Sequence, residues 1–292
     1  MTVSDIFEGR DRKTSAIAIV PAVVIALLVV GLLPDLIARV MRDTRLDQTL
    51  NLAWQSGIVT LVLFGCLIAA AFIWGLVSKR SVVPAGRMPL MMAGIGFAMG
   101  LFGLLITTGD AALAGSVHWT LSYAKPQILL LALGTLLTFY QSAAEELFFR
   151  GWIQPVLVRG WGPWVGLLVT SVMFAGLHVF AGITAPLSLL NVFLAGLMFG
   201  LLAYRTDGLV APVLAHFAWN WAEGILLGLY PNPGVDVWTA VWNLDMVGSP
   251  LWGGSAEGLN ASLGESFVLV ALCVPLAWPL FRRPAVAQAE AA

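Results

Sequence analysis

The chain has 292 residues, of which 59% are hydrophobic and 11% are charged, and its formal net charge at pH 7 is −1. A soluble domain typically carries about 25% charged residues, so this composition excludes an ordinary water-soluble fold. The sequence contains no phosphate-binding loop and no extended basic, aromatic-rich segment, so we expect neither a nucleotide nor a nucleic-acid partner.

Apolar segments recur along the chain, and several reach roughly the 20 residues that a helix needs to cross hydrocarbon. We therefore predict an all-α polytopic membrane protein, with about eight transmembrane helices that enclose an intramembrane cavity. The predicted domain covers 16–283, between a tail at 1–15 and a disordered tail at 284–292. The expected spans lie at 16–38, 52–77, 88–108, 127–149, 163–180, 186–204, 208–229 and 266–281.

The basic residues predict the orientation, because Lys and Arg concentrate in cytoplasmic connections. With both termini in the cytoplasm, the inner segments hold Arg10, Arg12, Lys13, Lys79, Arg80, Arg87, Arg150, Arg159, Arg205, Arg282 and Arg283. The outer segments hold only Arg39, Arg42, Arg45 and Lys125. We therefore expect cytoplasmic termini and, for a bacterial chain, a location in the inner membrane. The cluster at 39–45 departs from the rule, which suggests a first span that is longer or differently placed.

Other features of the spans favour packing roles. Cys66 and Cys273 both lie in apolar segments, so we interpret them as small hydrophobic residues rather than a disulfide or metal pair. The glycine pairs at 96 and 100 and at 196 and 200 predict close helix contacts. The connection 230–265 lacks Lys and Arg and carries several acids, which suits the outer face. Whether this connection gates access or caps the bundle is left open.

Polar residues within the spans are few, and charges at membrane depth are costly enough that they usually pair, face a cavity or serve chemistry. The set is Gln141, Glu145, Glu146, Arg150, His178, Asn191, His216, Asn220 and Glu223.

The two adjacent glutamates have different expected roles. Glu146 lies four residues before Arg150, the favourable order for an intrahelical ion pair. Glu145 is rotated about 100° from Glu146 and shares its face with Gln141. We therefore assign Glu146 to pairing and Glu145 to function.

Helix geometry tests whether Glu145 can meet a histidine. The connection "RGWGPW" centres near Trp161, with Glu145 16 residues before it and His178 17 residues after it. On antiparallel helices each side chain would lie roughly 24 to 26 Å from the turn. The two residues reach the same depth only if the fourth helix continues beyond Arg150.

The seventh expected span carries His216 and Asn220 one turn apart, and Glu223 follows on nearly the same stripe. A helix that starts near Gly208 puts His216 about 12 Å from its start. If the fourth and fifth helices protrude by a comparable length, Glu145, His178 and His216 align.

Three short segments resemble the ordered motifs EExxxR, FxxxH and HxxxN of the CAAX protease and bacteriocin-processing family, which includes the type II CAAX prenyl endopeptidases. They are "EELFFR" at 145–150, "FAGLH" at 174–178 and "HFAWN" at 216–220, and the resemblance covers residues 125–230. It implies an eight-helix intramembrane protease that cleaves a membrane-associated peptide or protein, with or without a lipid. The family also includes bacteriocin-immunity proteins.

The resemblance also implies a role for each motif residue. Glu145 becomes the general base, and His178 helps to hold and activate water. His216 and Asn220 become the oxyanion donors, while Glu146 and Arg150 take supporting roles. Peptide hydrolysis needs these components: a nucleophile, a proton acceptor and a place for negative charge.

Three alternatives remain open. Glu145, His178 and His216 could instead bind zinc with water as the fourth ligand. We favour a metal-free, cofactor-free site, because the chain has no HExxH pair and a ligating Glu145 would leave only Glu223 as an intramembrane base. A non-catalytic immunity or assembly protein could keep the same residues for packing. A transporter could use them as a proton relay, but it would be expected to show repeated half-structures, which the sequence lacks.

Overall fold

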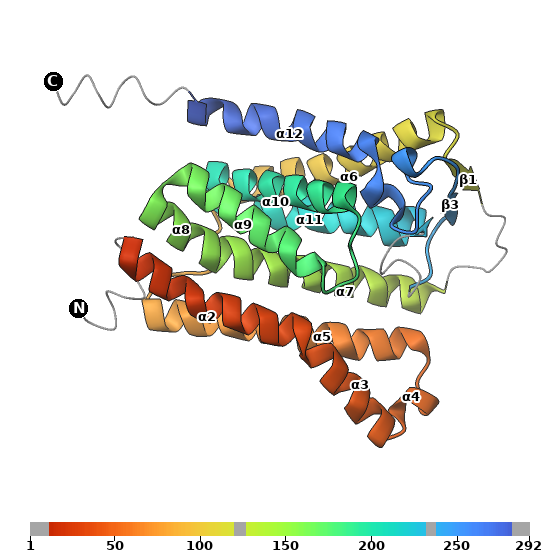
Figure 1. The fold of residues 1–292 in the computed structure, drawn as a ribbon, viewed down its shortest axis with the longest axis horizontal. Helices are drawn as coiled ribbons and strands as arrows, with labels where there is room; N and C mark the ends of the chain where they lie inside the picture. Colours follow the sequence, from red (N-terminus) through yellow and green to blue (C-terminus); the bar gives the residue numbers. More distant parts are fainter. Residues whose placement is uncertain (1–11, 120–126, 232–237, 282–292) are drawn as a thin grey trace.

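The computed structural model describes residues 12–119, 127–231 and 238–281, and it confirms an all-α polytopic architecture with one small sheet (Figure 1). Helices occupy all of the expected places. Within the described ranges, 6 helices are long and apolar enough to cross a membrane. The fifth and seventh expected spans are shorter helices, so length does not support the expected number of eight. The predicted tails lie largely outside the described residues.

The N-terminal part forms a separate helical layer (Figure 1). It comprises α2 (Arg12–Gly31), α3 (Leu33–Asp43), α4 (Leu46–Thr49) and α5 (Leu52–Ser78). Ala18, Ala22 and Ala26 are buried at a four-residue spacing, so one face of α2 consists of small residues that allow close packing. The first expected span thus continues to Asp43, which places Arg39 and Arg42 on a helix rather than in a connection.

Glycines bring α6 (Pro89–Leu113) against α11 (Val210–Trp221). A Cβ atom added to Gly96 or Gly100 would collide with the backbone carbonyl of Ala211 or Ala215. At the second pair, a Cβ on Gly200 would crowd the side chain of Gln154. Both predicted small-residue contacts are therefore confirmed.

The fourth expected span is longer than 127–149. It runs through α7 (Ile128–Glu146), the π-helix η1 (Leu147–Ile153) and α8 (Gln154–Trp161) without a break. Gly162 then turns the chain at a φ of 86°, and α9 (Pro163–His178) begins. The helix that carries Glu145 therefore continues beyond Arg150, as it must if Glu145 and His178 are to lie at the same depth.

The remaining long helices are α10 (Pro186–Thr206), α11 with its π-helical continuation η2 (Ala222–Leu227), and α12 (Leu263–Phe281). Here one expectation is wrong. The connection predicted at 230–265 includes Glu265, whereas this residue lies in the first turn of α12 and is only 2% exposed. Ser262 Oγ accepts a hydrogen bond from the Glu265 backbone N–H at 3.1 Å, which fixes the start of the helix.

A small sheet and two 3₁₀ turns cover one end of the bundle. The sheet order is β1 (Val117–Trp119), β3 (Leu244–Met246) and β2 (Leu229–Tyr230), with β1 antiparallel and β2 parallel to β3. The turns are η3 (Pro250–Trp252) and η4 (Gly258–Ala261).

Two polar side chains attach this region to the helices. Asn191 of α10 donates hydrogen bonds of 2.8 Å to the carbonyls of Asn260 and Ser262. Glu257 Oε1 accepts hydrogen bonds from the backbone N–H groups of Thr184 and Ala185, just before α10. The described part of the outer connection therefore caps the bundle.

Candidate active site

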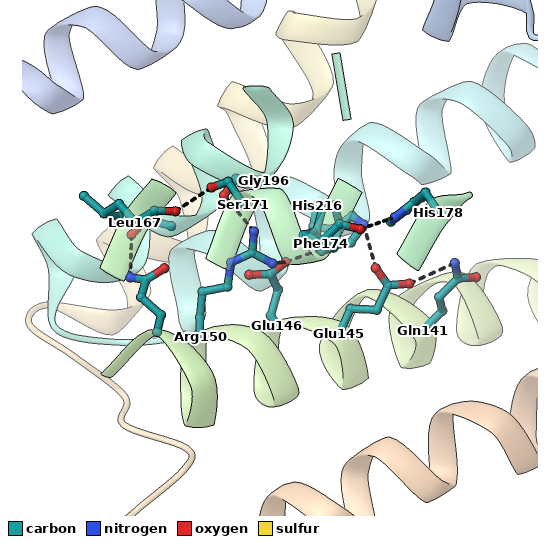
Figure 2. Close-up of polar contacts among 12 residues, drawn as sticks. Gln141, Glu145, Glu146, Arg150, Leu167, Ser171, Phe174, His178, Gly196 and His216 are labelled. Atoms are coloured by element: carbon teal, nitrogen blue, oxygen red, sulfur yellow. Dashed lines mark hydrogen bonds and ion pairs between the residues drawn. The ribbon is translucent and has the colours of Figure 1, made fainter. Parts of the chain in front are cut away.

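The site residues predicted from the sequence meet at one cavity of about 380 Å³. Glu145, His178, His216 and Asn220 all line this cavity, and so does Gln141. The structure thus brings together side chains from α7, α9 and α11. Glu146 is not part of this lining but is hydrogen-bonded to His216, and Arg150 is in turn hydrogen-bonded to Glu146 (Figure 2).

Glu145 lines the cavity, and its two carboxylate oxygens have different surroundings. Gln141 donates a hydrogen bond of 3.3 Å to its Oε1 from the same face of α7, as the sequence predicts. Glu145 Oε2 has no hydrogen-bond partner within the described residues and lies 4.0 Å from His216 Nε2. The residue as a whole is 7% exposed, and Oε2 is a buried oxygen whose hydrogen-bonding capacity is not used by the described residues.

Glu146 and Arg150 form the predicted intrahelical ion pair, with Nη1 2.9 Å from Oε1 and neither side chain exposed. Arg150 Nη2 donates a second hydrogen bond of 2.7 Å to the carbonyl of Gly196. Its guanidinium also lies over the ring of Phe174, 4.7 Å from the centroid, which permits a cation–π interaction. This buried charge is therefore compensated on three sides.

His216 contacts Glu146, and no spacing in the sequence predicts this contact. His216 Nδ1 lies 3.0 Å from Glu146 Oε1, and Phe199 stacks on the imidazole at 4.6 Å between centroids. A carboxylate accepts hydrogen bonds, so Nδ1 carries a proton and Nε2 faces Glu145 (Figure 2). The four-residue spacing predicted only the ion pair between Glu146 and Arg150.

His178 is oriented in a comparable way. Its Nδ1 donates a hydrogen bond of 2.8 Å to the carbonyl of Phe174, because a carbonyl can only accept (Figure 2). The ring packs against the Phe174 ring at 4.6 Å between centroids. Nε2 of His178 is therefore the nitrogen left for a ligand in the cavity.

The zinc alternative involves Glu145, His178 and His216. Across the parts of the chain that the structure describes, no group of three or more His, Cys, Asp or Glu side chains is arranged to hold a metal ion. The Nδ1 atoms of His178 and His216 are both engaged in hydrogen bonds, which leaves Nε2 of each ring for a ligand of either kind. Cys66 and Cys273 are free thiols on separate helices.

Sequence reasoning missed two further roles. Asn191 was noted as an intramembrane polar residue, but its function as the anchor of the outer cap depends on contacts far along the chain. Glu265 lines the cavity but was placed in a loop. The run "SLGE" at 262–265 is a capping-box pattern, and it could have located the helix start and brought Glu265 inside.

Comparison with known proteins supports the motif resemblance. Residues 126–222 match the family described as "Type II CAAX prenyl endopeptidase Rce1-like", and this segment contains all of the motif residues. A protein of Escherichia coli described as an uncharacterized 24.3 kDa protein is 36% identical over 99 residues, which are 32% of this chain and 42% of that protein. The chain thus matches less than half of that relative's length. No solved structure matches the chain.

Proposed function

Because residues 126–222 are an Rce1-like segment, we propose that this membrane protein is an intramembrane endopeptidase that uses Glu145 to activate water. The single observation that carries the proposal is the cavity between apolar helices, which is lined by Glu145, whose Oε2 has no hydrogen-bond partner in the described residues, and by two oriented histidines. The substrate class is a peptide or protein in the membrane, with or without a lipid group.

In the proposed reaction, a water molecule binds between Glu145 Oε2 and His178 Nε2. Glu145 removes one proton as the water oxygen attacks the peptide carbonyl carbon. The protonated Glu145 then donates this proton to the departing amine as the C–N bond breaks. Gln141 holds the other carboxylate oxygen, which fixes the orientation of the base.

The carbonyl oxygen becomes negative during this attack, and His216 and Asn220 supply the hydrogen bonds for it. Both residues lie on one face of α11 and line the cavity. Glu146 accepts a hydrogen bond from Nδ1 of His216, which orients the ring so that Nε2 points toward the proposed site of the developing charge. Arg150 keeps Glu146 in place for this contact.

We further propose that the end of the bundle opposite the sheet faces the cytoplasm. Arg87 and Asp207 form an ion pair of 2.8 Å there, and Lys79, Arg80 and Arg159 lie in or next to connections at the same end. Their charges follow the positive-inside rule.

The experiment compares wild type with Glu145→Gln in detergent, against prenylated and unprenylated membrane peptides, with products identified by mass spectrometry. We expect Glu145→Gln to lower turnover by about 100- to 10,000-fold, because it removes the base and preserves the shape. Asp43→Asn, at an exposed carboxylate far from the cavity, is the matched control and should cleave normally.

A chelator distinguishes the mechanisms. Cleavage that persists with chelator and disappears in Glu145→Gln supports the glutamate mechanism. Cleavage that chelator abolishes and zinc restores would assign Glu145 as a ligand. Binding of the peptides without cleavage by folded wild type would contradict the enzyme and favour an immunity or assembly role.

A further inference from the structure

Two further carboxylates line the same cavity, and the proposed reaction does not use them. Glu223 lies on η2 and Glu265 in the first turn of α12, and they are 7% and 2% exposed. Both side chains belong to the lining of this one cavity, although they come from different elements. Glu265 Oε2 has no hydrogen-bond partner in the described part of the chain, although it is almost completely buried.

Apart from its two histidines, the cavity has acidic but no basic side chains in its described lining. Its described lining contains the carboxylates of Glu145, Glu223 and Glu265, but no Lys or Arg. Arg150, outside this lining, is paired with Glu146. Neighbouring carboxylates in a poorly solvated site disfavour each other's charge, and a cation placed between them removes this cost.

The spacing relates this pair to the reacting centre. Glu223 follows His216 by seven residues on one continuous helical segment, which corresponds to roughly 10 Å. An extended peptide covers this distance in about three residues at roughly 3.3 Å each. A substrate side chain two to four residues from the cleaved bond can therefore reach the pair.

We propose that Glu223 and Glu265 form a specificity subsite that binds a protonated amine or guanidinium of the substrate. The proposal rests on the proposed endopeptidase function. An organic cation fits better than a metal ion, because no third His, Cys, Asp or Glu in the described residues completes a metal site. Trp219, which also lines the cavity, can contribute a cation–π contact to such a group.

The test measures binding separately from cleavage. Peptides with Lys, or with the neutral isostere norleucine, at two, three or four residues from the cleaved bond are bound to protein that carries Glu145→Gln. Chelator is present throughout. We expect the Lys peptide to bind about tenfold more tightly at one of these positions, the usual effect of a hydrogen bond to a charged group.

The variants then assign the preference to the two carboxylates. Added Glu265→Gln or Glu223→Gln should reduce the tenfold preference to about one, whereas Asp43→Asn should retain it. The variants lie on different elements, so one still tests the subsite if the other fails to fold. Two results overturn the proposal. One is equal binding of the Lys and norleucine peptides to protein that carries Glu145→Gln alone. The other is a preference for Lys that survives when Glu223→Gln or Glu265→Gln is added and the protein still folds.

Cleavage assays on protein with Glu145 intact separate the two proposals. A preference for Lys in binding without any cleavage would keep the subsite and overturn the endopeptidase. Cleavage of Lys and norleucine peptides at equal rates, combined with equal binding, would overturn the subsite and keep the endopeptidase.

Discussion

Two walls of the cavity differ in how they are built. The wall formed by α7, α9 and α11 carries an acid, two histidines and an asparagine, held by an ion pair and hydrogen bonds behind them. From α2 and α5, the described lining consists of Val30, Leu63, Phe64 and Leu67. Figure 1 shows these two helices as a layer beside α7 and α8. In the proposed reaction the polar wall supplies the chemistry, and the apolar wall limits the shape of the substrate.

Among the variants that test this difference between the walls, we expect the largest effect from Glu146→Gln, which changes the support of the polar wall. The change leaves the buried Arg150 without its carboxylate and alters the partner of His216 Nδ1. We expect it to destabilise the fold by about 3–5 kcal/mol, the usual effect of orphaning a buried charge. Thermal and denaturant unfolding in detergent measure this loss.

A double variant checks the cause. Combining Glu146→Gln with Arg150→Met removes both charges, so the destabilisation should be smaller than the sum of the two single effects. Strict additivity would show that the ion pair does not support the polar wall.

A smaller effect is expected at the outer cap. Asn191→Ala removes both hydrogen bonds to Asn260 and Ser262, and it also removes the acceptor of the Ser266 hydroxyl. We expect a loss of about 2 kcal/mol and faster amide exchange over 258–262. Ser266→Ala keeps both bonds to the carbonyls and serves as the milder control. Unchanged exchange in Asn191→Ala would contradict the anchoring role.

The apolar wall should respond in selectivity rather than in chemistry. Phe64→Ala widens the cavity from α5. We expect peptides with bulkier side chains to gain about tenfold in relative kcat/KM. Leu61→Ala, on the same helix but 51% exposed, should leave the ranking of peptides unchanged. A general loss of turnover in Phe64→Ala would instead make this wall part of the catalytic machinery.

The smallest expected effect concerns Glu257, outside the spans. Burial raises the pKa of this carboxyl, but the Ser188 hydroxyl, together with hydrogen bonds from Thr184 and the Ala185 N–H, outweighs burial and brings its pKa below the ordinary value of 4.5. A folded-state pKa below the unfolded value stabilises the protein above the unfolded pKa, and this stability is lost as the pH falls through the folded pKa.

Glu257→Gln tests this pH dependence. The wild type should unfold at a higher temperature than the variant at neutral pH, and the difference should close in acid. Thermal unfolding across an acid series measures it. A difference that does not change with pH would assign the effect to packing rather than to charge.

The sequence predicted features that depend on local helix geometry. The contacts of Glu145 with Gln141 and of Glu146 with Arg150 follow from a four-residue spacing, and both are present. The close approach of α6 and α11 followed from the glycines at 96 and 100.

Other features depend on contacts between distant segments. His216 reaches Glu146 from 70 residues away, and no periodicity encodes that pairing. Glu265 was misplaced because hydropathy locates the apolar part of a helix, whereas α12 begins with a polar turn.

The glycine contacts between α6 and α11 limit which segments of this protein can be transferred to another protein. His216 and Asn220 belong to the segment at 126–222, yet the helix that carries them rests on Gly96 and Gly100 outside it. Grafting that segment onto another helical scaffold would leave α11 without the glycine-lined surface against which its backbone packs. The segment at 126–222 is therefore not a transferable module, and any chimaera has to bring α6 with it.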